Sequence, residues 1–80
     1  MRVHLWGELG FYGPARASRF EVRLETELPL ADALRLIGIG VPAADVAVAA
    51  INGEAVRLDD PTITVTDGDR LDLVPPTSGG

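Results

Sequence analysis

The amino-acid sequence predicts one α+β domain, in which a mixed sheet of four to five strands packs on one main helix. The chain is 80 residues long, which leaves room for a single hydrophobic core. Apolar residues alternate with other residues in segments near both ends of the chain, as they do in strands, and only one segment between them has helical spacing. One helix covers one face of a sheet, so the other face is expected to lie open.

Two strands are expected before the helix. Val3 and Leu5 are two residues apart and share one side of an extended segment at residues 2–6, which predicts the first strand. Apolar and charged side chains alternate over residues 19–24, which predicts the second. Glycines and a proline interrupt the pattern over residues 7–18, so a long loop is expected to join the two strands in a hairpin.

One helix is expected over residues 30–37. Four apolar residues fall there at positions i, i+3, i+4 and i+7, on one helical face: Leu30, Ala33, Leu34 and Ile37. Pro29 is tolerated at the start of the helix, because its missing N–H has no partner there. Gly38 is suited to end the helix in a left-handed conformation. Two turns of helix are not stable alone, so this helix must pack on the sheet.

Three further strands are expected after the helix, at residues 46–51, 54–57 and 70–74. Asn52-Gly53 joins the first two in a tight hairpin, because both turn positions need a positive φ. A short β-branched segment at residues 62–65 has no assigned role.

The last strand is expected to place Leu71 and Leu73 toward the core and to end at Pro75-Pro76, because proline cannot donate a hydrogen bond to a sheet. The folded domain is therefore expected to span residues 1–76, and residues 77–80 are expected to form a flexible tail.

The charge distribution argues against a nucleic-acid partner. The formal net charge is −5, and the excess lies in residues 41–80, which hold seven acidic residues against two arginines. Binding to phosphates would need a basic stripe instead. An acidic half suits a protein partner with a basic docking surface, and it also suits solubility alone.

Composition excludes several kinds of site. Cysteine is absent, which removes disulfides and thiolate metal sites, and His4 is the single histidine and is expected to lie on the surface. Asp59-Asp60 precedes Pro61 in an expected turn, where aspartate commonly bonds the local backbone, so it is not interpreted as a catalytic pair. Neither a signal peptide nor an apolar run of membrane-spanning length is visible, so a cytoplasmic protein without membrane contact is expected.

Three stretches, in this order, resemble the ubiquitin-like sulfur carriers: Ala50-Ile51-Asn52-Gly53-Glu54, Asp67-Gly68-Asp69-Arg70-Leu71 and Val74-Pro75-Pro76-Thr77-Ser78-Gly79-Gly80. Members of that family carry a hairpin of the first kind, a turn of the second kind before the last strand, and a flexible segment that ends in Gly-Gly. They include the small subunit of molybdopterin synthase and the sulfur carrier of the thiamine pathway. The resemblance implies a β-grasp, ubiquitin-like fold.

The resemblance also implies a carrier that is not an enzyme and binds no cofactor itself. An activating enzyme would use ATP to adenylate Gly80, the product would become a thiocarboxylate, and a synthase would accept the sulfur. Gly79 and Gly80 suit a narrow channel, because glycine has no Cβ and lets backbone approach closely. The chain length and the ending favour the molybdopterin pathway, with the thiamine-thiazole or another thioacid pathway as the alternative. A non-covalent adaptor and a tag conjugated to lysines stay open as other functions.

A docking surface for these partners is expected on the open face of the sheet, at five residues: Trp6, Asp72, Val74, Pro75 and Pro76. If Val3 and Leu5 face the helix, Trp6 points to the open face. The β-grasp arrangement that the resemblance implies makes the first and last strands neighbours, which would place Val74 beside Trp6. Ala47 and Ala49 of the third strand are expected to join them.

Two alternatives to this surface stay open. Trp6 would fold over the sheet edge onto the long loop, against Phe11 or Tyr12, or docking would use an acidic strip formed by Asp67, Asp69 and Asp72.

Overall fold

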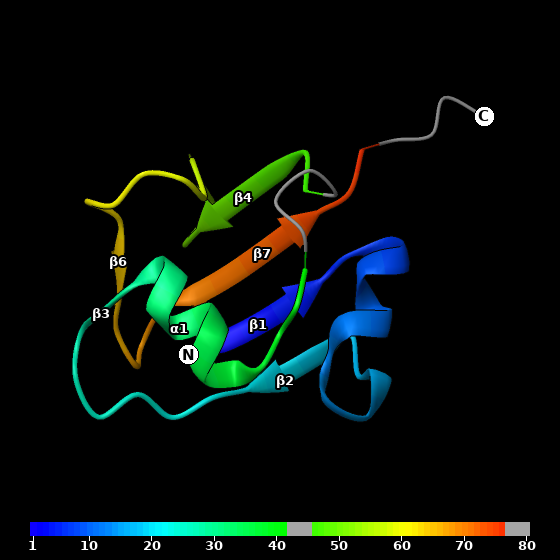
Figure 1. Cartoon of the computed structure of the whole chain (residues 1–80), viewed down its shortest axis with the longest axis horizontal. Coiled ribbons are helices and arrows are strands. Elements are labelled where there is room, and N and C mark those ends of the chain that lie inside the picture. The colour runs from blue at the N-terminus through cyan, green and yellow to red at the C-terminus, as the bar shows by residue number, and fades with distance from the viewer. Residues whose placement is uncertain (42–45, 77–80) are drawn as a thin grey trace.

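The computed structural model describes residues 1–41 and 46–76 of the chain. It forms a five-stranded mixed sheet in the order β2-β1-β7-β4-β5, with one α-helix (Figure 1). The strands are β1 (Arg2–Leu5), β2 (Arg19–Glu21), β4 (Val48–Ile51), β5 (Glu54–Val56) and β7 (Arg70–Val74). The predicted α+β, β-grasp arrangement is confirmed. The expected tail, with Gly79 and Gly80, lies outside the described residues.

The central strand is β7, and it runs parallel to its neighbour β1, while every other pair in the sheet is antiparallel. Residue pairing sets which side chains share a face: Val3 lies opposite Leu71, and Leu5 opposite Leu73. All four side chains are at most 2% exposed. Alternation along each strand therefore gives one aliphatic face that builds the core and one face that does not.

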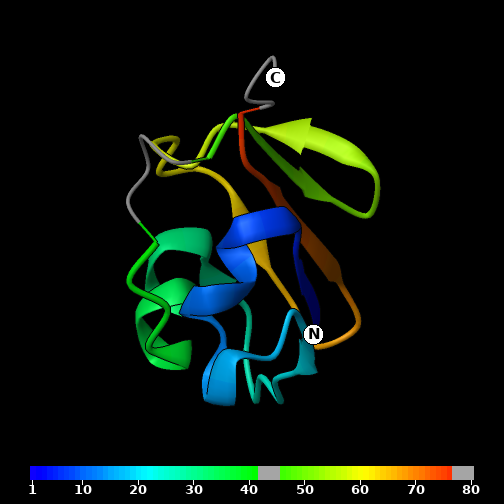
Figure 2. The same cartoon turned by 90° about the vertical axis from the view of Figure 1, so that its right-hand side faces the viewer.

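Helix α1 (Leu30–Ile37) packs against the aliphatic face, and no helix among the described residues covers the opposite face of the sheet (Figure 2). Its inward residues Leu30 and Ala33 are 1% and 0% exposed. Gly38 ends the helix with φ of 76°, and its N–H donates to the carbonyl of Arg35. The left-handed cap predicted at this glycine is thereby confirmed.

A second, two-stranded sheet pairs β3 (Leu28–Pro29) with β6 (Thr64–Val65). The sequence indicated a β-branched segment around β6 but gave no sign of β3. Two residues are too few to show a period, and Pro29 also stands at the start of α1. The N–H of Leu30 donates to the carbonyl of Ile63 at 2.9 Å, which ties the start of the helix to this ribbon.

The segment between β1 and β2 is more regular than the expected loop. It forms two 3₁₀ helices, η1 (Gly7–Tyr12) and η2 (Pro14–Arg16). Leu9 is 1% exposed and anchors η1 to the core, whereas Phe11 is 71% exposed. The glycines and the proline that broke the strand pattern did not reveal these short helices, because 3₁₀ turns lack a strong periodic signal.

The predicted orientation of the third strand was wrong. Ala49, expected on the open face, pairs with Leu73 and is 3% exposed, so it faces the core. Ala47 is exposed and precedes β4, and the open face of that strand instead carries Val48 and Ala50. Consecutive small apolar residues give no contrast between the faces, so the sequence could not fix the phase of this strand.

The hairpin turn after β4 follows the sequence closely. Asn52 and Gly53 have φ of 53° and 84°, as the prediction for this pair requires. The side chain of Asn52 then joins the turn to the next segment: its Oδ1 accepts from the N–H of Arg70 at 2.9 Å, and its Nδ2 donates to Asp69 Oδ1 at 2.9 Å. This residue therefore links β5's hairpin to the start of β7.

Candidate functional site

The candidate site lies at the edge of the sheet where β1 and β7 both end. Because these strands are parallel, their last residues meet at the same edge, next to the segment that leads toward the C-terminus (Figure 1). The N–H of Trp6 donates to the carbonyl of Leu73 at 2.9 Å, and the N–H of Ala47 donates to the carbonyl of Val74 at 2.8 Å. Pairing on both sides thus holds the chain up to Val74, directly before Pro75-Pro76.

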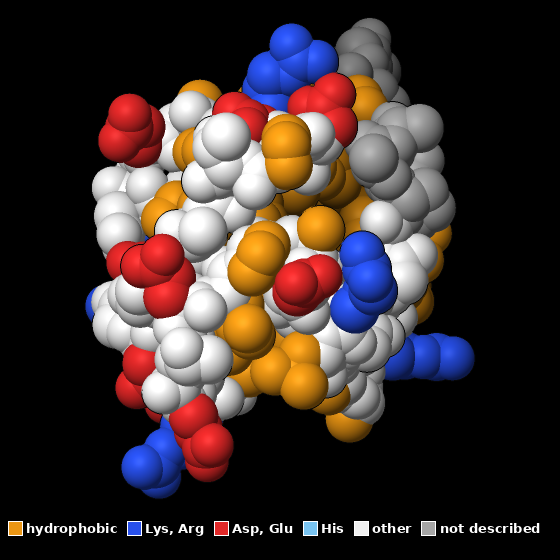
Figure 3. All heavy atoms as spheres, turned by 60° about the vertical axis from the view of Figure 1, so that its left-hand side comes forward, with side chains coloured by type: hydrophobic (Ala, Val, Ile, Leu, Met, Phe, Trp, Pro, Cys, Tyr) orange, Lys and Arg blue, Asp and Glu red, His pale blue; other side chains and the backbone are white. Residues whose placement is uncertain are grey.

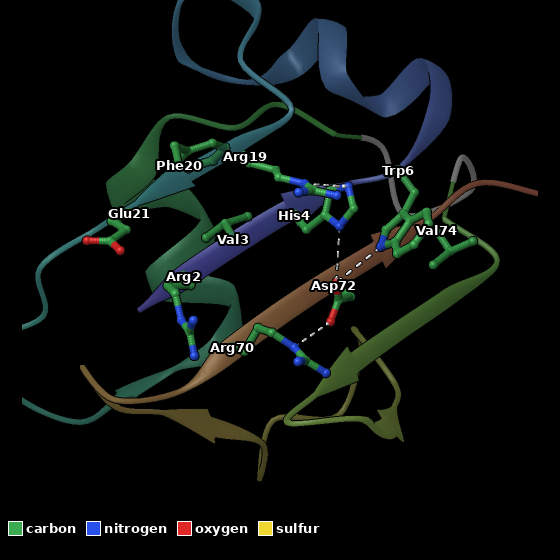
Figure 4. A pocket seen from close by; sticks show the side chains of 10 residues that line it. All are labelled: Arg2, Val3, His4, Trp6, Arg19, Phe20, Glu21, Arg70, Asp72 and Val74. Carbon is green, nitrogen blue, oxygen red and sulfur yellow. Dashed lines mark hydrogen bonds and ion pairs between the residues drawn. The ribbon is translucent and has the colours of Figure 1, made fainter.

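Trp6 lies on the open face and is 46% exposed. Its indole Nε1 donates to Asp72 Oδ1 at 3.1 Å, and its ring centroid is 4.2 Å from that of His4, with 32° between the planes. Figure 4 shows the indole lying between His4 and Val74. These contacts place Trp6 where the strand phase predicted, rather than over the sheet edge against Phe11 or Tyr12.

Asp72 is the centre of the polar contacts on this face. Its side chain is 16% exposed. In addition to the Trp6 indole, its carboxylate accepts from Arg70 Nε at 3.2 Å and lies 3.6 Å from His4 Nδ1 (Figure 4). One carboxylate therefore fixes an aromatic, a guanidinium and an imidazole from two neighbouring strands.

His4 is held on its other side by Arg19, whose Nε donates to His4 Nε2 at 3.5 Å. Nδ1, on the opposite side of the ring, faces Asp72. His4 was expected on the surface, but its side chain is only 20% exposed, so the residue is partly buried. Its role here is to support the Trp6 ring.

The apolar part of the site surrounds the start of the C-terminal segment. Val48 lies opposite Val74 and is 45% exposed. A Cβ added to Gly7 would come within 3.3 Å of Pro75 Cγ, and Gly7 has φ of 55°, so a glycine is needed where η1 passes the proline. We call Trp6, Val48, Val74, Pro75 and Pro76 the tail-base patch.

The structure brings together Trp6, Asp72, Val74 and Pro75, as predicted, and adds Val48. It also places Arg2, Arg19 and Arg70 around an open pocket of about 670 Å³ on the same face. The sequence analysis missed these arginines. Their alternation with buried residues was visible, but the shared location depends on the pairing of β1 with β7 and β2, which no local pattern shows.

The acidic strip considered as a second surface divides into two parts. Asp67 Oδ1 accepts from the N–H of Leu24 at 2.8 Å, and this hydrogen bond is the main cause that lowers the pKa of Asp67. Asp69 accepts from Asn52 and from the N–H of Thr66, which likewise lower the pKa of Asp69. These two carboxylates stabilise turns, whereas Asp72 faces the pocket.

Other kinds of site find no support in the described part of the chain. Within residues 1–41 and 46–76, no three His, Asp or Glu side chains are grouped closely enough to hold a metal ion. The same residues contain no helix that is long and apolar enough to cross a membrane.

A comparison with models of protein families shows to which family the chain belongs. The model of the ThiS family matches residues 10–80, which is most of the chain and includes the tail-base patch apart from Trp6. The chain belongs to the ThiS family. Members of this family are small, non-catalytic sulfur carriers that interact with an adenylating enzyme and with a sulfur-accepting synthase. No curated protein matches the chain significantly.

ThiS family membership confirms the resemblance to ubiquitin-like sulfur carriers that the three sequence stretches indicated. The matched range also covers Gly79 and Gly80.

Proposed function

We propose that this sulfur carrier works through the backbone carboxylate of Gly80. A carboxylate oxygen attacks the α-phosphorus of ATP on an adenylating enzyme, the bond to the β-phosphate breaks, and pyrophosphate leaves. A donor at the oxidation level of sulfide then attacks the acyl carbon, and AMP leaves. The product is a thiocarboxylate at Gly80, from which a synthase takes the sulfur.

The observation that carries this proposal is the family match through residue 80, in a chain that contains no cysteine. Without a thiol, the chain offers no side chain on which sulfur is ordinarily carried. A C-terminal thioacid is a form of carried sulfur that needs only the backbone.

The position at which β7 ends supports a role for the last residues of the chain. Within the described residues, the last backbone pairing before the C-terminus is at Val74, and Pro76 is the last of these residues. Four further residues span at most about 14 Å when extended. Gly80 is thus able to reach an active site roughly that far inside a partner, while the tail-base patch contacts the surface of the partner. Pro75-Pro76 stiffens the start of this segment, so less conformational entropy is lost when the segment enters the active site of the partner.

We propose the molybdopterin pathway as the destination of the sulfur. The chain length and the ending Pro75-Pro76-Thr77-Ser78-Gly79-Gly80 support it. The thiamine-thiazole pathway and other thioacid pathways use the same chemistry at the carrier. Transfer from the loaded carrier to the large subunit of molybdopterin synthase, compared with transfer to a thiazole synthase, distinguishes them.

Reconstitution tests the proposed chemistry. The full chain is incubated with the adenylating enzyme of the same organism, ATP and sulfide, and the C-terminal peptide is analysed by mass spectrometry. One oxygen of Gly80 should be replaced by sulfur, and only when ATP is present. An ATP-dependent isopeptide bond to lysines of other proteins, without a thioacid, would instead support a conjugated tag and contradict the proposal.

Two matched glycine variants separate the tail from the fold. Gly79→Ala adds a Cβ next to the reacting residue and is expected to slow thiocarboxylate formation strongly. Gly40→Ala is the control, since a Cβ there meets no atom within 4 Å. Deletion of Gly79-Gly80 should abolish the reaction and leave the melting temperature nearly unchanged, because the buried residues that the structure describes all lie between Met1 and Leu73. A pure adaptor would keep its function after this deletion.

A further inference from the structure

The open face differs in charge from the rest of the molecule. Three arginines and two acidic residues line its pocket: Arg2, Arg19, Arg70, Glu21 and Asp72. Their formal sum is 3 − 2 = +1, whereas the whole chain carries −5, so the remaining residues carry −6. Figure 3 shows acidic side chains spread over the side of the molecule that carries β3 and β6. The positive charge is therefore local to one face of an acidic protein.

The three arginines are not neutralised equally. Arg70 is paired with Asp72, but Arg19 contacts an imidazole nitrogen of His4 rather than a carboxylate. Among the residues that the structure describes, none forms an ion pair or a side-chain hydrogen bond with Arg2.

The sheet register also sets two like charges side by side. Arg2 lies directly opposite Arg70 in the parallel β1–β7 pair, and on its other side it lies opposite Glu21 of β2, with which it forms no ion pair. Like charges in this position repel and destabilise a sheet. Figure 4 shows both side chains projecting from the same face. An external carboxylate between two guanidinium groups would remove the repulsion and form charge-assisted hydrogen bonds.

The arrangement extends too far for a small ligand. Arg2 and Trp6 are four residues apart along β1, a distance of about 13 Å in an extended strand. The cationic residues therefore begin at one end of the face, and the tail-base patch lies at the other. A partner that covers both has the size of a protein interface, for which about 800 Å² on each side is usual.

We infer that the adenylating enzyme docks on the open face through an acidic surface, whose carboxylates meet Arg2, Arg19 and Arg70 while an apolar contact covers Trp6 and Val74. This inference rests on the proposed function, which places that enzyme at the C-terminal segment. The net charge of the chain led us to expect a basic partner surface, and for the open face we infer an acidic one instead. The negative charge elsewhere on the carrier repels the same acidic surface, so the local positive charge selects one orientation.

A pair of double variants tests the docking surface. Arg2→Gln/Arg19→Gln removes two charges from the open face, and Arg35→Gln/Arg57→Gln removes two from elsewhere. Arg35 and Arg57 are the matched control because their side chains are 80% and 81% exposed and each pairs with a nearby aspartate. Affinity of the full chain for the adenylating enzyme is titrated at low and at physiological salt, and urea unfolding checks that each variant is folded.

The open-face pair should bind about tenfold more weakly at low salt, and the loss should shrink as salt rises. The control pair should stay within about twofold of the parent. Equal losses in both pairs, no loss in the open-face pair, or tighter binding by that pair would each overturn the inference. Tighter binding would mean that the enzyme surface is basic.

Two further readouts separate this inference from others. Titration with inorganic phosphate tests a small-anion site: phosphate binding that is lost in Arg2→Gln/Arg19→Gln, with enzyme affinity unchanged, contradicts the docking surface. Mass spectrometry of the parent protein tests the proposed function separately. Charge-dependent binding without thiocarboxylate at Gly80 would disprove the sulfur chemistry and keep the docking surface.

Discussion

The two faces of the sheet are built from the same strands and differ in almost every property. On the covered face, Leu5, Leu71 and Leu73 are fully buried under α1. On the open face, their neighbours in sequence include Trp6 and Asp72, which remain accessible and are held by polar contacts. Because consecutive residues of a strand face opposite sides, residues that stabilise the core alternate with residues of the candidate docking surface. Changes on one face should therefore leave the task of the other face nearly untouched.

The largest expected effect is at the covered face. Leu73→Ala should lower the free energy of unfolding by about 2–5 kcal/mol, because it leaves a cavity in a core of limited size. Val74→Ala is the matched control on the open face and should cost about 1 kcal/mol or less, since Val74 is only partly buried. Urea unfolding of both variants measures the difference. Similar losses at the two positions would show that the faces do not divide stability as described.

Truncation of Trp6, the aromatic residue of the open face, should weaken partner binding and change stability little. Trp6→Ala is expected to weaken binding to the adenylating enzyme or the synthase by about 2 kcal/mol or more, because a large desolvated contact is lost. Stability should change much less than in Leu73→Ala, since no core cavity forms.

Phe11→Ala is the control for Trp6→Ala, because Phe11 is a more exposed aromatic on η1. Its affinity for both partners should stay within about twofold of the parent. Calorimetric titrations measure both variants. Severe destabilisation by Trp6→Ala would contradict the observed position of Trp6, and unchanged affinity for both partners would move the docking surface away from the open face.

Asp72 should show a smaller effect that links the polar contacts to the aromatic. Asp72→Asn keeps an acceptor for the Trp6 indole but removes the charge that pairs with Arg70, and it should cost about 1 kcal/mol of stability. Trp6 is the single tryptophan, so its fluorescence reports on the change. Asp59→Asn removes a more exposed carboxylate and should alter neither the fluorescence nor the stability measurably. A fluorescence spectrum unchanged by Asp72→Asn would mean that Asp72 does not position the indole.

The smallest expected effect is on the stability of the fold at low pH. The pKa values of Asp67 and Asp69 are lowered in the folded protein by hydrogen bonds from Leu24 and Asn52. A lowered folded-state pKa stabilises the fold above the unfolded value of about 3.9, and this stabilisation is lost as the pH falls through the folded-state pKa. Urea unfolding should therefore show falling stability below about pH 4. In Asp69→Asn the fall should be shallower. An equally steep fall in that variant would assign the acid sensitivity to other groups.

Sequence patterns predicted the elements that have a clear period or a demanding turn. The aliphatic alternation around Val3 and Leu71, the helical spacing from Leu30 and the positive φ of Asn52-Gly53 were each predicted correctly. The β3–β6 ribbon and the 3₁₀ helices were missed because they are too short to show a period. The phase of Ala49 was wrong because its neighbours are equally small and apolar.

The candidate site was predicted in part for a similar reason. Trp6, Asp72 and Val74 were expected together from strand phase and from the β-grasp resemblance, which implies that the first and last strands are neighbours. The structure places the three residues around one pocket. The grouping of Arg2 with Arg70 depends on the register of β1 against β7, which a single sequence does not specify. The charge of a face therefore became visible only once the strands were paired.

The most direct test of the central claim is the intact mass of the protein purified from its own host cells. A chain that ends at Gly80 and carries one sulfur in place of one oxygen at that residue is the predicted species, and fragmentation should locate the sulfur at the C-terminus. A sulfur located at any other position, or a mature chain that does not end at Gly80, would contradict the claim that this carboxylate is the working group of the carrier.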